Sequence, residues 1–176
     1  LIFYGDLDIT VIADKPKERQ EVATSIIPQY KYDDMLEYIR KQTKAGRQAY
    51  FVCAKIDDDE GQVTSVTELY EELRGRLPDV RFALLHGRMK EKDKAQIMSA
   101  FKRKEYDCLV STTVIEVGVD VPNATIMVIM NAERYGLSQL HQLRGRVGRG
   151  TEKSWCFLLV GSESEAAIER LTVLKS

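Results

Sequence analysis

Two hydrophobic patterns alternate along this chain. Short continuous apolar runs, of which AYFVCA at residues 49–54 is the clearest, are typical of strands covered on both faces. Between these runs, apolar residues recur every three or four positions, and this spacing predicts amphipathic helices. The runs predict strands at residues 21–27, 48–56, 81–85, 108–111, 125–130 and 155–160, with a further strand-like run at 9–13. The spacing predicts helices at residues 32–44, 66–77, 90–103 and 165–174, an acidic loop at 57–62, and one short helix before residue 145.

Strands that alternate with amphipathic helices predict a parallel α/β sheet, because right-handed crossovers between parallel strands place the helices over the sheet. Ligands of such sheets bind beyond the carboxyl ends of the strands. Small and polar residues follow three of the predicted strands, namely His86-Gly87, Ser111-Thr112-Thr113 and Asn131. We therefore expect these residues at one edge of the sheet.

A leucine stripe leads into a glycine-rich stretch, QLHQLRGRVGRG, at residues 139–150. Leu137, Leu140 and Leu143 recur every three residues and predict the apolar face of a short helix. From Gly145 onward, glycines permit a positive φ and close approach of the backbone. We therefore expect the helix to end there in a turn.

Three arginines, Arg144, Arg146 and Arg149, lie on this turn, with Gln142 just before them. The planar guanidinium fork binds phosphate oxygens in pairs and keeps its charge. Three such groups repel one another unless an anion lies between them, so a polyphosphate is the expected ligand. The alternative is a solvated basic helix end, which suits the helix dipole. A dinucleotide-binding fingerprint fits less well, because the glycines follow GxxGxG after a helix and not GxGxxG after a strand.

The net charge of −1 gives no argument for a nucleic-acid partner, so any such argument must be local. Residues 86–104 contain seven basic side chains and two acidic ones, an excess that matches a nucleic-acid footprint. A solvated helix face explains the lysines equally well when they are taken alone. His86, Gly87 and Arg88 follow a strand, where backbone amides bind phosphate without reading base identity, although His86 can also be a plain loop histidine.

Hydroxyl and carboxylate groups follow the next predicted strand. Thr112 and Thr113 can cap a helix or donate to a phosphate, and capping alone is the simpler explanation. Gly118 and Asp120 offer close backbone approach and a carboxylate for ribose hydroxyls, although glycine and aspartate also simply form turns. The chain has no GxxxxGK[ST] loop and no paired acids at a strand end to hold magnesium, so these residues make only part of a nucleotide site.

Length and composition fit one soluble globular domain, with 176 residues of which 44% are hydrophobic and 30% charged. The three cysteines are far apart and odd in number, so we expect buried reduced thiols of a cytosolic protein and neither a disulfide framework nor a zinc site. Asp6 and Asp8 interrupt the apolar N-terminus, which argues against a signal peptide, and no apolar run approaches a membrane span. Because the chain begins at Leu1, we expect it to be part of a longer protein.

Three motifs together resemble the second motor domain of superfamily-two helicases, and more closely the RecG family of branched-DNA helicases. They are LHGRM at residues 85–89, STTVIEVGVDVPNAT at 111–125 and AERYGLSQLHQLRGRVGRG at 132–150. FYGDLD at residues 3–8 resembles the segment that leaves the first motor domain. The matches span most of the chain and are highly specific. The transcription-repair coupling translocase shares the QLRGRVGRG core and is the weaker relative.

The resemblance implies a RecA-like α/β fold with three layers, a mostly parallel sheet and helices on both faces. It implies that Arg146 and Arg149 reach across a cleft to the γ-phosphate of ATP, and that Gln142 supports them or the attacking water. ATP with Mg²⁺ would be held mainly by the first motor domain of the longer protein. Gly118 and Asp120 would face the ribose, whereas Arg144 points less clearly to ATP, and a structural role is its alternative.

The resemblance also assigns the DNA backbone to five residues, namely His86, Gly87, Arg88, Thr112 and Thr113. The implied partners are branched DNA and the protein's own N-terminal motor and DNA-binding domains, in the cytoplasm of a bacterium and without a membrane. We predict that residues 1–20 end the first motor domain and that residues 21–176 form the second. The chain departs from the family at Met130, where glutamate is usual, and at residues 17–19, which replace a glycine-containing linker.

The expected function is that of the C-terminal motor domain of an ATP-dependent DNA helicase that acts on forks and junctions in repair and recombination. The fragment alone is expected to hydrolyse no ATP. A nucleic-acid-binding module without a nucleotide role remains an alternative. A metabolic α/β enzyme with a phosphorylated substrate is the other, although no acid/base pair lies near the arginines.

Overall fold

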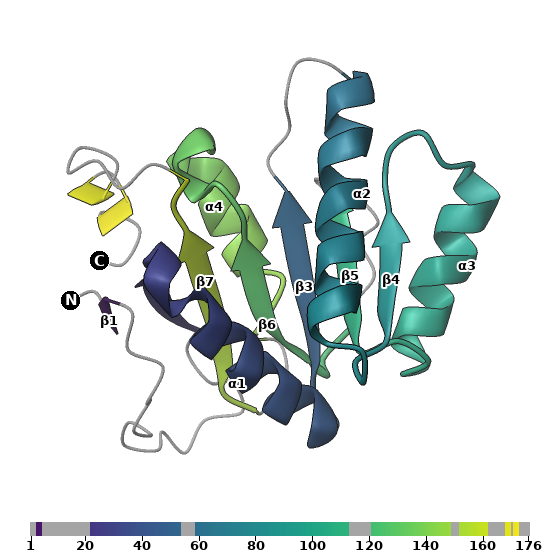
Figure 1. Ribbon diagram of the computed structural model, residues 1–176, viewed down its shortest axis with the longest axis horizontal. Coiled ribbons are helices and arrows are strands. Elements are labelled where there is room, and N and C mark those ends of the chain that lie inside the picture. The colour runs from purple at the N-terminus through teal and green to yellow at the C-terminus, as the bar shows by residue number, and fades with distance from the viewer. Residues whose placement is uncertain are drawn as a thin grey trace.

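The chain folds around a parallel sheet, seen in a computed structural model that describes residues 3–4, 22–53, 59–112, 121–148, 152–161, 168–169 and 171–172. Within these ranges seven strands pair in the order β1-β2-β7-β6-β3-β5-β4, and every pair is parallel (Figure 1). The strands are β1 (Phe3–Tyr4), β2 (Val22–Ile27), β3 (Gln48–Cys53), β4 (Phe82–Leu85), β5 (Cys108–Thr112), β6 (Ala124–Ile129) and β7 (Ser154–Leu159).

Four α-helices and two 3₁₀ turns connect the strands of the described ranges. The helices are α1 (Tyr32–Lys44), α2 (Asp59–Arg76), α3 (Glu91–Lys102) and α4 (Leu137–Arg144). The 3₁₀ turns are η1 (Gln29–Lys31) and η3 (Ala132–Arg134). Figure 1 shows α1 and α2 in front of the sheet and α4 behind it.

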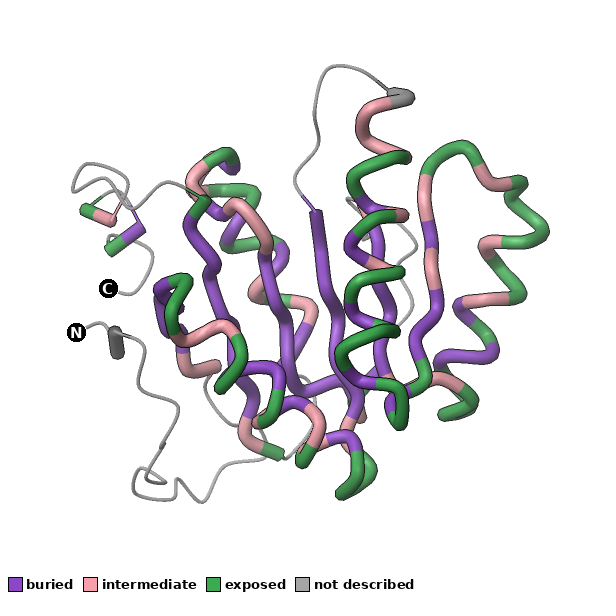
Figure 2. The backbone as a smooth tube through the Cα atoms, in the orientation of Figure 1, coloured by how far each residue is buried: buried purple, intermediate pink, exposed green. Residues whose placement is uncertain are grey.

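Two separate hydrophobic cores confirm the three-layer architecture. One core packs α1 and α2 against one face of the sheet, with Phe51 and Phe157 fully buried between them. The other packs α3 and α4 against the opposite face, around Phe101 and Leu140. Figure 2 shows the strands buried along most of their length, whereas buried and exposed residues alternate on the helices. The predicted RecA-like arrangement, with helices on both faces of a parallel sheet, is confirmed.

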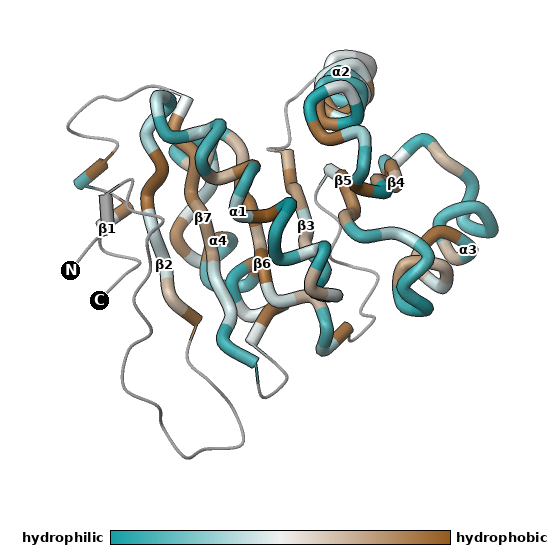
Figure 3. The backbone as a smooth tube through the Cα atoms, turned by 60° about the horizontal axis from the view of Figure 1, so that its bottom comes forward, coloured by the Kyte–Doolittle hydropathy of each residue, from teal (hydrophilic) through white to brown (hydrophobic). Residues whose placement is uncertain are grey.

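Helix α1 shows how the local pattern sets an element. Met35, Leu36 and Ile39 are all buried, and Figure 3 shows hydrophilic and hydrophobic segments alternating along this helix. Acidic residues occupy its first turn and lysines its last, which suits the helix dipole. Gly46 follows with a φ of 98°, a conformation that glycine adopts without strain and that ends the helix.

Most predicted elements are confirmed to within a residue or two, but the predicted acidic loop at 57–62 is wrong from Asp59 onward. Helix α2 begins at Asp59 and not near Val66. Acidic residues favour the first turn of a helix, so a run of aspartates before an apolar stripe marks a helix start as well as a loop. Strand β5 also continues through Thr112, so Ser111 lies buried inside the strand and not at its exit.

The three cysteines are buried and free, as expected. Residues Phe3–Tyr4 pair with β2 in the same sheet, with Phe3 opposite Ser25. The predicted strand at 9–13 and most of the predicted helix at 165–174 lie outside the described residues. None of the helices in the described ranges is both long and apolar enough to cross a membrane.

Candidate functional site

The first candidate site is the turn that follows β4. Leu85 pairs with Ser111, so His86, the first residue after β4, lies next to Thr112, the last residue of β5, which still pairs with Cys53 of β3. The turn closes through a hydrogen bond from the Met89 amide to the His86 carbonyl at 3.2 Å. Gly87 and Arg88 are exposed, which leaves the tip of this turn open to a ligand. The structure therefore brings His86, Gly87, Arg88 and Thr112 together as predicted, whereas Thr113 lies outside the described residues.

The imidazole of His86 is held in one orientation by its own turn. The Arg88 amide donates to His86 Nδ1 at 3.3 Å, so the proton of the neutral ring is assigned to Nε2. Partial burial lowers the pKa of His86, and the positive charges of Lys94 and Arg88 lower it further. The neutral ring thus presents an Nε2–H donor at a place where several positive charges gather.

The basic stretch at 86–104 extends along the whole of α3 and is not gathered at the His86 turn. Helix α3 contains 12 residues, which places its two ends about 18 Å apart at ~1.5 Å per residue. Arg88 and the first lysines lie at the end near the His86 turn, whereas residues 102–104 lie at the other end. There Arg103 pairs with Glu105 at 2.7 Å. Only the first half of the stretch can contribute to a site at the His86 turn.

The second candidate site is the turn that follows α4. Leu140 and Leu143 of the predicted stripe are buried, and the helix ends at Arg144. The positive φ falls at Gly148, with 80°, whereas Gly145 keeps a helical φ of −69°. Val147 between them is fully buried and fixes the turn to the core. The turn is confirmed, but its left-handed residue lies three positions later than expected.

The arginines of this turn do not all share one rim. Arg144 faces the sheet, because its Nη1 donates to the Thr24 hydroxyl of β2 at 3.3 Å. Arg146 is half-buried and Gln142 is exposed on the last turn of α4. Arg149 lies outside the described residues, as do Gly118 and Asp120, the residues predicted to face the ribose. The expected cluster of three guanidiniums is therefore wrong for Arg144.

The two candidate sites lie toward opposite ends of the parallel strands. Helix α4 begins after the carboxyl end of β6 and leads back to the start of β7, so the turn with Arg146 lies toward the amino ends of the strands. His86 and Thr112 lie at the carboxyl ends of β4 and β5. One ligand the size of a nucleotide cannot contact both sites, so each needs its own partner.

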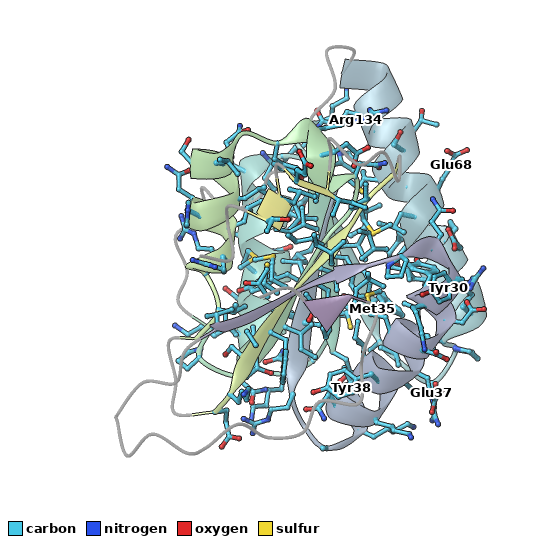
Figure 4. All side chains as sticks on the ribbon, turned by 90° about the vertical axis from the view of Figure 1, so that its left-hand side faces the viewer. Tyr30, Met35, Glu37, Tyr38, Glu68 and Arg134 are labelled. Atoms are coloured by element: carbon cyan, nitrogen blue, oxygen red, sulfur yellow. The ribbon has the colours of Figure 1, made fainter. Side chains whose placement is uncertain are left out.

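A cavity of about 480 Å³, which the sequence pattern did not reveal, lies at the carboxyl ends of β2, β6 and β7. Its apolar floor comes from the ends of the strands, and its rim includes Arg76, which pairs with Glu72 at 3.3 Å and also with Asp33. Met130, the residue that departs from the family pattern, lines this cavity. Tyr30 precedes α1 with 74% of its surface exposed, on the α1 side of the sheet (Figure 4).

The two loops at the rim of this cavity are tied together. The Gly161 amide donates to Glu133 Oε1 at 2.9 Å. Asn131 adopts the left-handed conformation with a φ of 51°, and its side-chain Nδ2 occupies the space that a Cβ on residue 161 would need, so only glycine fits there. Among the described residues, no group of three or more His, Cys, Asp or Glu side chains is arranged to hold a metal ion.

Comparison with known proteins places this fold and these motifs in one family. The pattern described as "Helicase conserved C-terminal domain" matches residues 30–151. The chain is 49% identical over 173 residues to the ATP-dependent DNA helicase RecG of Thermotoga maritima, which covers 97% of this chain and 22% of the relative. It is 46% identical to RecG of Synechocystis over 99% of this chain and 21% of the relative. The chain thus spans about a fifth of the length of these relatives.

Solved structures agree with this result. RecG bound to a three-way DNA junction superposes with a TM-score of 0.76 and 46% sequence identity, over 97% of this chain and 22% of that protein. The S. cerevisiae protein Dbp5, without substitution and bound to RNA and ADP BeF3, has a TM-score of 0.62 at 14% identity, over 88% of this chain and 38% of that one, which supports the fold alone. The expected resemblance to RecG is confirmed, and the chain belongs to the helicase conserved C-terminal domain family.

Proposed function

We propose that this chain is the second motor domain of a RecG-like, ATP-dependent DNA helicase that remodels forks and junctions in bacterial DNA repair and recombination. The observation that carries the proposal is the pair of turns at opposite ends of the parallel strands, one around His86 and one around Arg146. A motor domain needs two such sites, because it must bind a nucleic-acid backbone and respond to a nucleotide. The similarity to RecG bound to a DNA junction, at 46% identity over 97% of the chain, supports this reading.

The turn after β4 is proposed to bind the DNA backbone. The Nε2–H of His86, the Arg88 guanidinium and the Thr112 hydroxyl are donors of the kind that phosphate oxygens accept. Gly87 is exposed between them and permits close approach of the backbone. Thr113 is proposed to extend this set. These groups distinguish a phosphate from water but do not read base identity, so binding should be independent of sequence.

The turn after α4 is proposed to act on ATP that is held, with Mg²⁺, mainly by the first motor domain of the longer protein. Arg146 is only half-buried, and Gln142 on the adjacent helical turn is exposed, so both are available to a ligand from outside the domain. ATP supplies the phosphoryl group whose oxygens gain charge as the bond to the leaving group breaks. Arg146 and Arg149 donate to those oxygens, and Gln142 orients a donor or the attacking water. Gly118 and Asp120 are proposed to contact the ribose.

The wide separation of the two turns fits a mechanical role. Closure of the two motor domains on ATP moves this domain as one packed body. The phosphate contacts of the His86 turn then shift to a new position along the DNA strand. The proposed partners are branched DNA and the N-terminal motor and DNA-binding domains of the same protein, in the bacterial cytoplasm.

The test is a pair of substitutions in the longer protein, one in each turn. Arg146→Lys keeps the charge but loses the planar fork, so DNA-stimulated ATP turnover should fall about a hundredfold, with little change in DNA affinity without nucleotide. Arg88→Ala should weaken DNA binding equally across sequences and reduce the slope of log affinity against log salt by about one unit. Arg40→Lys is the matched control, because Arg40 only joins surface ion pairs with Glu37 and Asp79.

Three outcomes would contradict the proposal. Normal turnover in Arg146→Lys would leave Arg146 as a solvated helix end. Equal loss of turnover and of nucleotide-free DNA binding in Arg146→Lys would assign it to the DNA site, as in a nucleic-acid-binding module. An effect of Arg88→Ala confined to one base sequence would show a contact to bases.

A further inference from the structure

Arg144 is an unusual residue at the place it occupies. It ends α4 and is half-buried against the sheet, and its guanidinium donates to Thr24 Oγ1 at 3.3 Å. Its Nη2 lies 3.4 Å from His141 Nδ1, one turn back on the same helix. Because a guanidinium can only donate, both contacts require an acceptor, and Thr24 and His141 each supply one. The side chain thus joins the end of α4 to β2, a strand that is far away in the sequence.

The contact meets the sheet at β2, beside β7. Thr24 of β2 is paired with Cys156 of β7 in the parallel register, and both residues are buried. Burial raises the pKa of the Cys156 thiol to about 12, and the positive charge of Arg144 acts against that rise. The guanidinium therefore connects the end of α4 to β2, at the residue that is paired with Cys156 of β7.

If this position only packed against the sheet, an apolar side chain would stabilise the fold better than an arginine. A guanidinium that leaves water loses hydration energy, and replacing such groups by apolar residues is often neutral or stabilising. What arginine adds is a set of donors at fixed angles, which holds a helix end in one orientation. A role in orientation explains the choice of residue better than a role in stability.

The backbone of Arg144 is part of the turn that carries Arg146. The Val147 amide donates to the Arg144 carbonyl at 3.3 Å, and the Arg146 amide donates to the Leu143 carbonyl at 3.0 Å. Arg146 is only two residues farther on, so a rotation of Arg144 about the helix axis moves Arg146 with it. A displacement of about 1 Å at a catalytic group can cost about a hundredfold in rate.

We propose that Arg144 is a positioning residue, which sets the place of Arg146 relative to the sheet by anchoring the end of α4 on the Thr24 hydroxyl. The proposal rests on the proposed function, because it presumes that Arg146 acts on ATP. Arg144 itself does not contact the nucleotide in this scheme. The anchor would let the turn keep one geometry while the domain moves as a body.

The experiment compares Arg144→Lys, Thr24→Val and Thr24→Ser in the longer protein. Thr24→Val removes the acceptor while keeping the volume, whereas Thr24→Ser keeps the hydroxyl. The first two should lower kcat for DNA-stimulated ATP hydrolysis about tenfold or more, with KM for ATP changed less than about threefold, because only transition-state contacts are misplaced. Thr24→Ser should retain at least about half of the turnover, because the acceptor is still present.

Two further measurements separate positioning from general stability. The affinity for ADP with aluminium fluoride, which resembles the transition state, should fall about tenfold in Arg144→Lys, whereas the affinity for ADP alone should not change. In an Arg146→Lys background, adding Arg144→Lys should lower the residual turnover less than about twofold, because coupled residues are not additive. Thermal midpoints are measured for every variant. If Arg144→Lys does not fold, the comparison of Thr24→Val with Thr24→Ser tests the proposal.

Several results would overturn the proposal. Normal turnover in both Arg144→Lys and Thr24→Val would do so, as would equal losses in Thr24→Val and Thr24→Ser. An undiminished effect of Arg144→Lys in the Arg146→Lys background would show that Arg144 acts independently of Arg146. Failure of the proposed function looks different, since Arg146→Lys alone would then keep normal turnover.

Discussion

Gln48, at the start of β3, is a buried polar side chain that joins three parts of the chain. Only 2% of its surface is exposed. Its Nε2 donates to the Phe101 carbonyl at 2.7 Å and to the Tyr106 carbonyl at 2.8 Å. Its Oε1 accepts a hydrogen bond from Asn123 Nδ2 at 3.0 Å. The side chain thus fixes the end of α3 and the loop before β6 to the centre of the sheet.

Replacing Gln48 by Met keeps the volume but removes all three hydrogen bonds. The Phe101 carbonyl keeps the Lys104 amide at 2.9 Å, and Asn123 keeps the Gly46 carbonyl at 2.8 Å. The largest loss therefore falls on the Tyr106 carbonyl. The hydrogen bond to that carbonyl is part-buried, and an acceptor left without its donor costs about 1–3 kcal/mol, so we expect Gln48→Met to lower the free energy of unfolding by about 1–3 kcal/mol.

Urea unfolding of the purified chain, followed by circular dichroism, measures this loss. With a slope of about 2 kcal/mol/M, the midpoint should fall by about 1 M. Gln96→Met is the matched control, because Gln96 is exposed on α3 and its change should stay within about 0.5 kcal/mol. If Gln48→Met destabilises the chain no more than Gln96→Met does, the hydrogen bonds of Gln48 contribute nothing net and the reasoning fails.

Three further predictions concern the candidate sites and the core. Gly148→Ala should destabilise the chain by about 1–2 kcal/mol in urea unfolding, because its φ of 80° disfavours a side chain, and equal stability would contradict this. Burial raises the pKa of Cys53 and of Cys156 to about 12, so a thiol reagent at pH 8 should label neither before urea unfolds the chain. The pKa of His86 is lowered in the folded chain, so the unfolded chain takes up a proton first as the pH falls through ~6.5, and stability declines. Thermal midpoints at pH 7.5 and 5.5 should show a smaller decline in His86→Gln, and equal declines would refute the assignment.

Local patterns were sufficient to predict the elements and the layers. Helix α1 was predicted with the bounds it has, because its apolar spacing and the following glycine both act within one element. The start of α2 was missed, because acidic residues before an apolar stripe are equally common in loops and in first helical turns. The site of the positive φ was also not predictable. Gly145 and Gly148 are chemically identical, and only the burial of Val147 between them decides which one must turn.

Contacts between distant segments lay beyond the reach of pattern analysis. The sequence leaves a structural role open for Arg144 but cannot name its partner, because Thr24 lies 120 residues away in the sequence. The cavity at the ends of β2, β6 and β7 depends likewise on Arg76, which meets Asp33 across 43 residues. By contrast, His86 and Thr112 were predicted to lie together, because the rule that parallel strands end at one edge carries long-range information.

The positions of the two proposed sites place a requirement on the domain between them. If ATP is bound at the turn of Arg146 and DNA at the turn of His86, a displacement caused by ATP at one turn must be transmitted through the sheet to the other. A close-packed core transmits displacement because it cannot deform continuously. Polar ties then matter where helices meet the sheet, since packing alone allows a helix to slide or rotate. Gln48 provides such a tie at the end of α3 that lies away from the His86 turn, and Arg144 provides one for α4, which precedes the Arg146 turn. In the proposed scheme, each of these two helices is thereby anchored to the sheet by a side chain that is assigned to neither DNA nor ATP.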